Sequence, residues 1–236
     1  APEPLGNPDC KVDNYPEQEV YDYQRIAVEK LVKMKRMICR VATGGGKGRI
    51  AKIAHARIGR RTLFLTTRDI LAKQIKNGID KDGIFTTGFI GGGKYEPDTA
   101  SFGFTAAMVQ TLAERLKEPQ SGDSSSKAMR QLRIREKTIE FLESIDLIIG
   151  EEAHEAGGNS YFDILSYCKN AHYRLALTAT PFMRDGADGN MRLMAQFGNI
   201  GINISEKFLI DRGILAKPYF IYYKNNIDLK KFFFNN

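Results

Sequence analysis

The chain has 236 residues, of which 42% are apolar, so it can bury one sizeable core without disulfides or structural metal ions. Its net charge of +7 favours a polyanionic partner, and its three cysteines are not spaced as a disulfide or zinc pair. The apolar runs are far shorter than the roughly 20 residues that a membrane span needs, so we expect a soluble, cytoplasmic protein without a membrane partner.

Apolar runs rich in β-branched and aromatic residues alternate with amphipathic stretches, which is typical of βαβ units around a parallel sheet. In chain order the sequence predicts a helix at 22–35, a strand at 37–41, a helix at 47–58, a strand at 62–66, a helix at 69–77, a strand-prone region at 83–93, a strand at 102–107 with a helix after it, a polar loop at 118–127, a helix at 127–143, strands at 145–150 and 173–180, a helix at 205–212 and a strand at 217–223. The expected fold class is α/β, with a central, mostly parallel β-sheet flanked by helices.

A Gly-rich loop, ATGGGKGRI at 42–50, stands between a predicted strand and a predicted helix, which is the context of a phosphate-binding loop. Consecutive glycines let backbone N–H groups turn inward, the helix N-terminus attracts anions, and Lys47 supplies a full positive charge. The candidate nucleotide-binding residues here are Thr43, Gly44, Gly45, Gly46, Lys47, Gly48 and Arg49. A Gly-rich turn with an exposed lysine is the alternative.

A second group of polar residues follows a buried strand, in IDLIIGEEAHEAGG at 145–158. Ligands bind at the carboxyl ends of the strands in open α/β sheets. There, one carboxylate can hold Mg²⁺ and its neighbour can orient and deprotonate an attacking water. The alternative is the first turn of a solvated helix, where acidic residues are also favoured.

Together, the Gly-rich loop, Glu-Glu-Ala-His at 151–154 and Thr-Ala-Thr at 178–180 resemble motifs I, II and III of superfamily 2 helicases of the DEAH kind. YDYQRIAV (21–28), LTTRDILAKQ (65–74) and AMVQTLAERL (107–116) resemble the glutamine motif and motifs Ia and Ib. With the IGGG run at 90–93, the resemblance is greatest to phage recombination and branch-migration helicases, and it covers roughly residues 20 to 220. It implies a RecA-like P-loop NTPase domain that uses ATP and Mg²⁺, and host cytoplasm as the location if a phage encodes it.

For the nucleotide, the resemblance implies that Gln24 reads the adenine edge while Tyr21 or Tyr23 stacks on the ring. Lys47 would bind phosphate, and Glu152 would be the general base that positions the hydrolytic water. The residues that the resemblance implies for coupling nucleotide state to movement are His154, Thr178 and Thr180, and those for contacting the nucleic-acid backbone are Thr67, Arg68, Gln110 and Thr111.

The chain departs from the family pattern at two positions that both concern Mg²⁺. Gly48 stands where the family has a Ser or Thr hydroxyl ligand, and Glu151 stands where it has an aspartate. Thr43 is not expected to reach the vacant coordination position, so water would fill it. The longer Glu151 side chain could compensate; the alternative is a weakened or dead ATPase. We expect hydrolysis to be retained, because Lys47 and Glu152 are both in place.

The expected organisation is an N-terminal extension at 1–19, a RecA-like domain at 20–215, and a lead into a second motor domain at 216–236. Superfamily 2 motors hydrolyse ATP between two such domains, the second supplying arginines that stabilise the transferred phosphate. Residues 216–236 leave no room for that second RecA-like partner. We therefore expect the 236 residues by themselves to bind nucleotide but to hydrolyse it poorly.

The leading hypothesis is an ATP-dependent DNA helicase or translocase acting in recombination, repair or replication, with single-stranded or branched DNA preferred over RNA as partner. One rival is a nucleotide-gated DNA-binding module with little hydrolysis. Another is the translocase of a restriction-type complex, which ranks lower because the sequence offers no nuclease-like cluster outside the motor motifs. A small-molecule P-loop kinase ranks last, since it does not account for EEAH followed by TAT.

Overall fold

The computed structural model describes residues 2–6, 22–83, 85–119, 125–153, 158–182 and 187–221. Its strands are β1 (Arg36–Val41), β2 (Thr62–Thr66), β3 (Thr87–Gly91), β4 (Lys94–Glu96), β5 (Phe104–Met108), β6 (Leu147–Glu151), β7 (Tyr173–Thr178) and β8 (Ile200–Ile204). Its helices are α1 (Asp22–Met34), α2 (Lys47–Ile58), α3 (Asp69–Asp82), α4 (Val109–Leu116), α5 (Ser126–Glu143), α6 (Asn159–Tyr167), α7 (Ala187–Phe197) and α8 (Glu206–Asp211).

The described strands form one sheet in the order β4-β3-β5-β2-β6-β7-β1-β8. Every neighbouring pair is parallel except the β3–β4 hairpin, whose strands are antiparallel. The predicted α/β class with a mostly parallel sheet is therefore confirmed. Because β6 and β7 lie between β1 and β2, segments distant in sequence become neighbours in the sheet.

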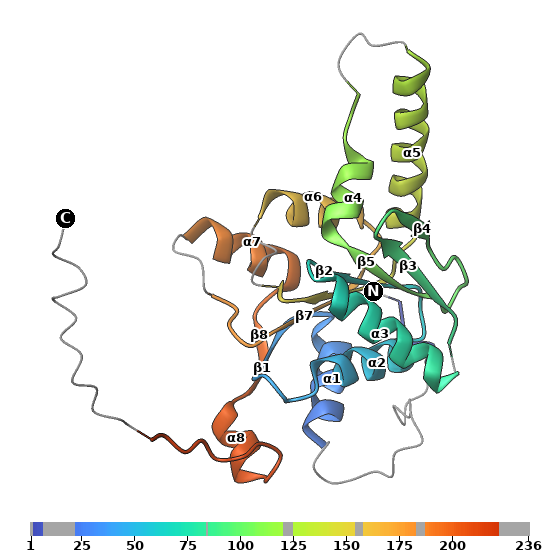
Figure 1. Ribbon diagram of the computed structural model, residues 1–236. Helices are drawn as coiled ribbons and strands as arrows, with labels where there is room; N and C mark the ends of the chain where they lie inside the picture. The colour runs from blue at the N-terminus through green and yellow to red at the C-terminus, as the bar shows by residue number, and fades with distance from the viewer. Residues whose placement is uncertain are drawn as a thin grey trace, which may run out of the picture.

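Helices cover both faces of the sheet (Figure 1). Successive strand residues point to opposite faces, so Ile149 of β6 joins the apolar cluster under α1, α2 and α3, whereas Ile148 joins the cluster under α4, α6 and α7. All five residues of β6 are buried. Burial on both faces explains why the central strands read as short, continuous apolar runs.

The predicted elements agree with the structure from α1 through β2. Helix α3 is longer than predicted: it ends at Asp82 and is capped by Gly83, which has a left-handed φ of 67°. The sequence interpretation missed β4, α6, α7 and β8. The predicted strand at 217–223 is wrong over its described residues, which form no strand. Tyr219 is 90% exposed, so the aromatic residues of this segment have no sheet to pack on.

One part of the molecule stands out from its body. Helices α4 and α5 form an arm that projects beyond the other elements (Figure 1). In the part of the chain that the structure describes, no helix is long and apolar enough to cross a membrane.

His55 is fully buried in α2 between Phe85 and Phe104, with its Nδ1 2.8 Å from the Thr62 hydroxyl. Its Nε2 has no hydrogen-bond partner among the described residues. Burial lowers the pKa of His55 from 6.5 to about 4, and Asp98 opposes this shift. The folded protein therefore keeps His55 neutral at pH values where the unfolded chain binds a proton.

We expect His55 to lower the free energy of unfolding as the pH falls from about 6.5 to about 4, by up to about 3 kcal/mol. The unfolded chain takes up the proton in this window and the folded chain does not. Urea unfolding at several pH values would measure it in the wild type and in His55→Gln, which cannot titrate. Parallel pH profiles for the two proteins would contradict the assignment.

Candidate active site

Parallel pairing brings the predicted motifs to one edge of the sheet. β5, β2, β6, β7 and β1 lie side by side in this order, and all point the same way. The predicted site residues lie at or just after the carboxyl ends of these strands. In the same order as the strands, they are 110–111, 67–68, 151–152, 178–180 and the Gly-rich loop. The order in space differs from the order in the chain. It places the expected nucleotide-binding residues at one end of the row and the expected nucleic-acid contacts at the other.

The Gly-rich loop leads from β1 into the N-terminus of α2, which begins at Lys47. Gly44 and Gly46 have φ values of 85° and 80°, in the left-handed region that favours glycine. A Cβ on Gly46 would lie 2.3 Å from Gln24 Nε2. The left-handed turn at Gly46 leads directly into the N-terminus of α2, whose dipole favours an anion.

Two residues of α1 hydrogen-bond to one side of the Gly-rich loop. The Tyr23 hydroxyl donates to the Gly45 carbonyl oxygen at 3.0 Å, and Gln24 Nε2 donates to the same oxygen at 3.3 Å. Gln24 is only 1% exposed, and its Oε1 has no hydrogen-bond partner among the described residues. Tyr23 and Gln24 thus touch the loop directly, while adenine recognition by Gln24 stays a prediction. Tyr21 lies outside the described residues.

The segment around α8 packs on the loop from the other side. A Cβ on Gly44 would lie 2.6 Å from Leu215 Cδ2, and one on Gly45 would lie 3.2 Å from Leu209 Cδ1. Phe208 meets the Tyr23 ring edge-on at 5.7 Å. Sequence reasoning missed these contacts, because nothing in the pattern of 205–215 indicates which distant loop it will cover.

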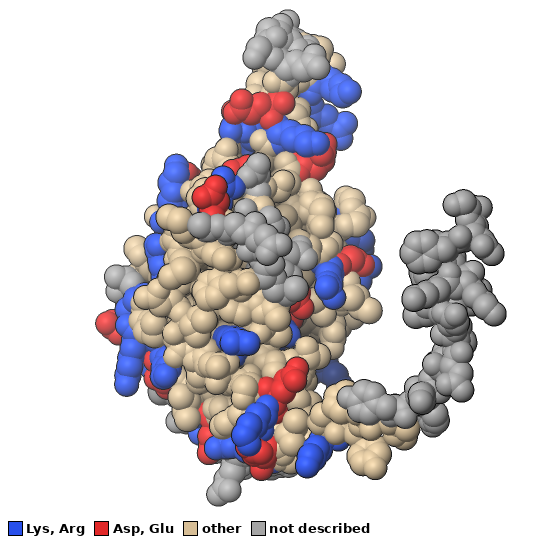
Figure 2. Space-filling view, turned by 90° about the vertical axis from the view of Figure 1, so that its left-hand side faces the viewer, with Lys and Arg blue, Asp and Glu red and all other residues tan. Residues whose placement is uncertain are grey.

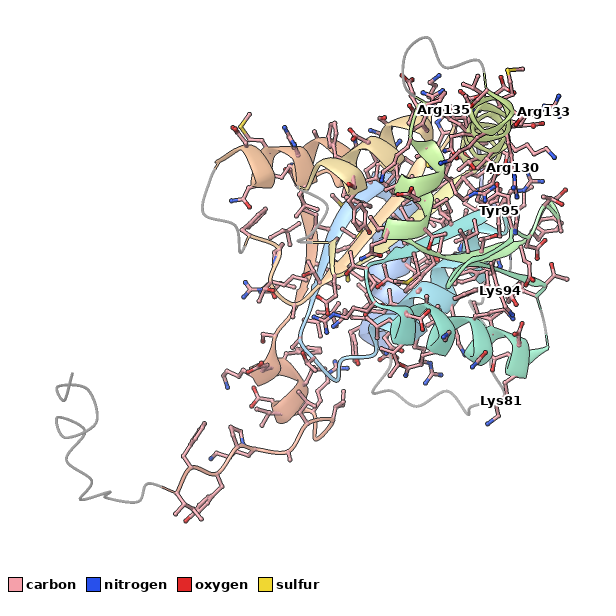
Figure 3. All side chains as sticks on the ribbon, turned by 45° about the horizontal axis from the view of Figure 1, so that its top comes forward. Lys81, Lys94, Tyr95, Arg130, Arg133 and Arg135 are labelled. Atoms are coloured by element: carbon pink, nitrogen blue, oxygen red, sulfur yellow. The ribbon has the colours of Figure 1, made fainter. Side chains whose placement is uncertain are left out.

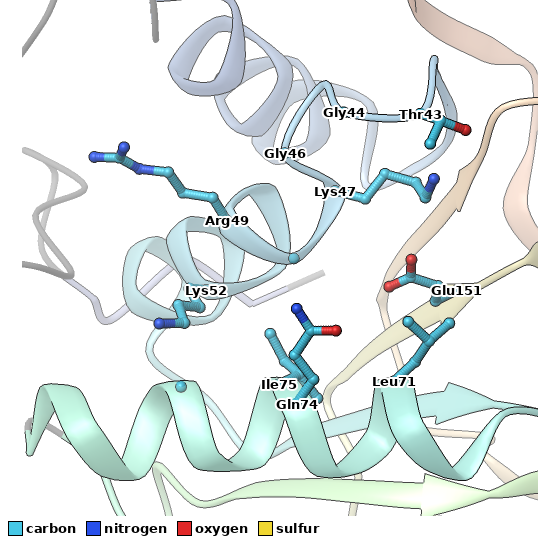
Figure 4. Close-up of a pocket in the computed structure, with 12 residues that line it drawn as sticks. Thr43, Gly44, Gly46, Lys47, Arg49, Lys52, Leu71, Gln74, Ile75 and Glu151 are labelled. Atoms are coloured by element: carbon cyan, nitrogen blue, oxygen red, sulfur yellow. The ribbon is translucent and has the colours of Figure 1, made fainter.

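A cavity of about 650 Å³ opens beside the loop (Figure 4). Its walls come from the Gly-rich loop, the first turns of α2, one side of α3 and the end of β6; the lining residues are Thr43, Gly44, Gly46, Lys47, Gly48, Arg49, Lys52, Leu71, Gln74, Ile75, Gly78 and Glu151. Figure 4 shows the Lys47 side chain reaching toward Thr43 and Glu151. The α3 side of the cavity was not predicted, since α3 meets α2 only through the folding of the chain.

Glu151 and Glu152 differ in their surroundings. Glu151 is 7% exposed, and burial raises the pKa of its carboxyl above the usual value, while Lys47 and Arg68 oppose the shift. Glu152 is half-buried and has a φ of 51°. A non-glycine residue in that region costs about 1–3 kcal/mol, and such strain clusters at functional sites.

Gly150 brings the end of β6 close to helices on the far face. A Cβ there would lie 2.6 Å from the Tyr161 hydroxyl, which donates to the Leu65 carbonyl oxygen at 3.3 Å. A side chain at position 150 would displace Tyr161 and shift the strand end that carries the carboxylates. Gly150 and Tyr161 therefore act as positioning residues that the motifs did not reveal.

The remaining predicted residues lie at the same edge. Thr178 is fully buried, and its hydroxyl accepts from the Thr180 N–H at 3.2 Å. Gln110 Nε2 donates to the Thr67 carbonyl oxygen at 3.2 Å, which joins the first turn of α4 to the segment after β2. Arg68 is exposed and Thr111 is half-buried. His154 lies outside the described residues.

The residues present fit a nucleotide phosphate and a magnesium ion. The glycine cradle, the N-terminus of α2 and Lys47 suit a phosphate chain, and the Glu151 carboxylate is a hard oxygen ligand at the wall of the same cavity. A Cβ on Gly48 would meet only Ile75 Cδ1, at 3.7 Å. The absence of a hydroxyl at position 48 is therefore not imposed by crowding, and Mg²⁺ commonly keeps several waters.

The sequence matches the family described as "Type III restriction enzyme, res subunit" over residues 17–183. No curated protein matches it significantly.

Several solved structures share the fold at low identity. The UvsW helicase from bacteriophage T4 is 22% identical with a TM-score of 0.56, and the match covers 80% of this chain and 61% of that one. The Hef helicase domain from Pyrococcus furiosus is 24% identical with a TM-score of 0.52, covering 75% and 36%. The type ISP restriction-modification enzyme LlaGI, solved with a DNA substrate mimic, is 16% identical with a TM-score of 0.57, covering 85% and 21%. This chain thus spans less than two thirds of each of these proteins.

We expect Gly46→Ala to lower nucleotide affinity at least about tenfold, because the left-handed backbone alone costs an alanine about 1–2 kcal/mol and the new Cβ meets Gln24. Gly48→Ala is the matched control: its Cβ has room, and α2 gains up to about 1 kcal/mol of helix propensity. Titration with a fluorescent ATP analogue and thermal unfolding would compare them. Equal affinities for the two variants would mean that the loop does not cradle phosphate.

Proposed function

Because the chain belongs to the type III restriction enzyme res subunit family, whose members are helicase-type motor domains, we propose that it is the ATP-binding motor domain of a DNA helicase or translocase. One observation carries the proposal. The N-terminus of α2 with Lys47 faces Glu151 across one cavity, at the edge where the other strands of the sheet also end. The type ISP restriction-modification enzyme LlaGI, which has a similar fold, was solved with a DNA substrate mimic, and this supports DNA as the partner.

In the proposed mechanism the loop binds the phosphates of ATP. Lys47 places its ammonium group on the β and γ phosphates, and N–H groups at the start of α2 add hydrogen bonds. The contacts from Tyr23, Gln24 and Leu215 keep the loop backbone in this shape before nucleotide arrives. Because the loop is already ordered, nucleotide binding does not incur the entropy cost of ordering it.

Glu151 and Glu152 have different roles in the proposed mechanism. Glu151 would hold Mg²⁺, which neutralises charge on the phosphates when bound, with water completing the coordination beside Gly48. Glu152 would orient the attacking water and accept its proton. The strained backbone at Glu152 is the observation that favours this role, since it turns the residue away from the direction of the strand.

A second candidate, distinct from a motor that unwinds DNA, is the translocase of a restriction-type complex, which would move along duplex DNA without separating its strands. The family match favours it directly, and LlaGI has a similar fold. Two assays of the complete gene product separate the candidates. A helicase releases a strand from forked DNA, whereas a translocase displaces a third strand from a triplex while the duplex stays intact.

We expect Glu152→Gln to lower phosphate release by the complete gene product about 10²–10⁴-fold, the usual contribution of a general base, while nucleotide affinity is kept. Lys47→Ala should instead lose the affinity itself. Phosphate release with and without DNA, beside an equilibrium nucleotide titration, measures both properties. A wild type that binds ATP but releases no phosphate, with or without DNA, would support the nucleotide-gated binding module instead.

The two departures at the magnesium site should be energetically coupled if Glu151 compensates for Gly48. We expect Glu151→Asp alone to weaken Mg²⁺-dependent turnover, and Glu151→Asp with Gly48→Ser to restore it, because the pair then provides a hydroxyl and a shorter carboxylate. Mg²⁺ titrations of ATPase activity in the single and double variants test this. Strictly additive effects in that cycle would show that the two positions act independently.

A further inference from the structure

The arm formed by α4 and α5 has no part in the nucleotide site. Helix α4 starts at the strand-end edge with Gln110, but α5 ends at Glu143 and leads into the opposite end of β6, at Leu147. Helix α5 has 18 residues and is therefore about 27 Å long, and its first half rises clear of the sheet (Figure 1). Any ligand of the outer arm is thus separate from the row of motifs.

One side of α5 holds the arm together. Gln131 donates to carbonyl oxygens at the C-terminal end of α4, including that of Lys117 at 3.1 Å. Arg135 Nε donates to the Leu116 carbonyl oxygen at 3.1 Å, and its guanidinium pairs with Glu118 at 2.8 Å. These side chains satisfy the last carbonyls of α4 and make the arm a rigid unit.

A neighbouring side of α5 carries three further basic residues, Arg130, Arg133 and Lys137, which we call the arm stripe. Their i, i+3, i+7 spacing aligns them along the helix. All three are exposed, and within the described part of the chain none has an acidic partner within ion-pair distance. Figure 3 looks nearly along α5 and shows Arg133 on the opposite side of the helix from Arg135. Arg135 is thus structural, whereas the stripe has no partner that would explain its charge.

The surroundings of the arm stripe favour a phosphate backbone over bases. Tyr95, from β4, is joined to α5 through a hydrogen bond from its hydroxyl to the Lys137 carbonyl oxygen at 3.4 Å. Its ring is covered by the Arg115 guanidinium at 3.4 Å, so that face is not open to stack on a base. The nearby Lys94 is exposed and adds a further positive charge (Figure 3). Exposed positive charge beside a ring with one face covered suits the backbone of a duplex, whose bases are turned inward.

We propose that the arm stripe grips the backbone of duplex DNA at a second surface, away from the motif edge. The stripe spans about 10 Å, or about three base-pair steps, so a rigid duplex can meet all three charges at once. Figure 2 shows Lys and Arg side chains gathered on the arm while the middle of that face is mostly uncharged. Acidic residues also lie on the arm, and Glu140 ends the stripe three residues after Lys137. The inference rests on the proposed function, in that the motor acts on DNA.

The test compares two charge-matched triple variants of the 236-residue chain. The arm variant is Arg130→Gln, Arg133→Gln, Lys137→Gln, and glutamine keeps the helix propensity. The control is Lys33→Gln, Arg36→Gln, Lys217→Gln, at exposed positions remote from the arm and from the cavity. Fluorescence anisotropy with a labelled duplex, measured over a range of salt concentrations, gives the affinity and its salt dependence.

We expect the arm variant to bind duplex about tenfold more weakly, and the slope of log K against log salt to fall by about 0.9 per lost phosphate contact. The control should keep the wild-type slope, and ATP binding should be unchanged in both. Glu140→Gln should tighten duplex binding, a gain that misfolding does not produce. Equal slopes for the arm variant and the control overturn the proposal.

Two further measurements distinguish a failure of the second surface from a failure of the proposed function. Arg68→Gln reports on the motif edge: if it weakens duplex binding while the arm variant does not, only the second surface is lost. If the wild type binds no nucleic acid, the proposed function and the second DNA-binding surface are both wrong. If the arm variant loses binding to polyglutamate while its duplex binding is unchanged, the ligand of the arm is an acidic polypeptide, and the proposal is overturned.

Discussion

Parallel pairing of β6 with β2 and β7 is the constraint on which the candidate site depends. The register sets Glu151 of β6 opposite Leu177 of β7, and Thr178 opposite Arg40 of β1. The carboxylates, the Thr-Ala-Thr turn and the Gly-rich loop therefore follow one another along a single edge. A shift of one residue in β6 would turn every side chain of that strand to the other face and carry Glu151 out of the cavity.

The shape of the Gly-rich loop is set by segments that arrive from both ends of the chain. Helix α1 reaches its Gly45 carbonyl oxygen, and Leu209 and Leu215 close on its other side. This packing leaves no space for a Cβ at Gly44 or Gly46, yet leaves space at Gly48. The expected phosphate-binding shape of the loop is thus compatible with the unusual magnesium ligands that the sequence predicts, because the two depend on different contacts.

Two groups of charged residues bear on the proposed function. At the motif edge, Lys47 and Arg68 lie close enough to Glu151 to oppose the rise in its pKa that burial causes. On the arm, internal contacts use Arg135 but not Arg130, Arg133 or Lys137. A motor that holds DNA at two separated surfaces can keep hold of it at one while the nucleotide state changes the other, which gives the arm a physical role in the proposed function.

Sequence alone determined the fold class and the elements from α1 to β2, and it predicted which residues form the candidate site, because these depend on local periodicity and on short motifs with tight steric and charge requirements. It failed over 217–221, the described part of a predicted strand, where strand propensity met no neighbouring strand, and it missed β4, β8, α6 and α7. Only the tertiary structure decided which motifs became neighbours, that Gly150 and Tyr161 position the carboxylates, and that α3 and Leu215 help to enclose the loop. These features arise from contacts between residues far apart in the chain, which no local pattern encodes.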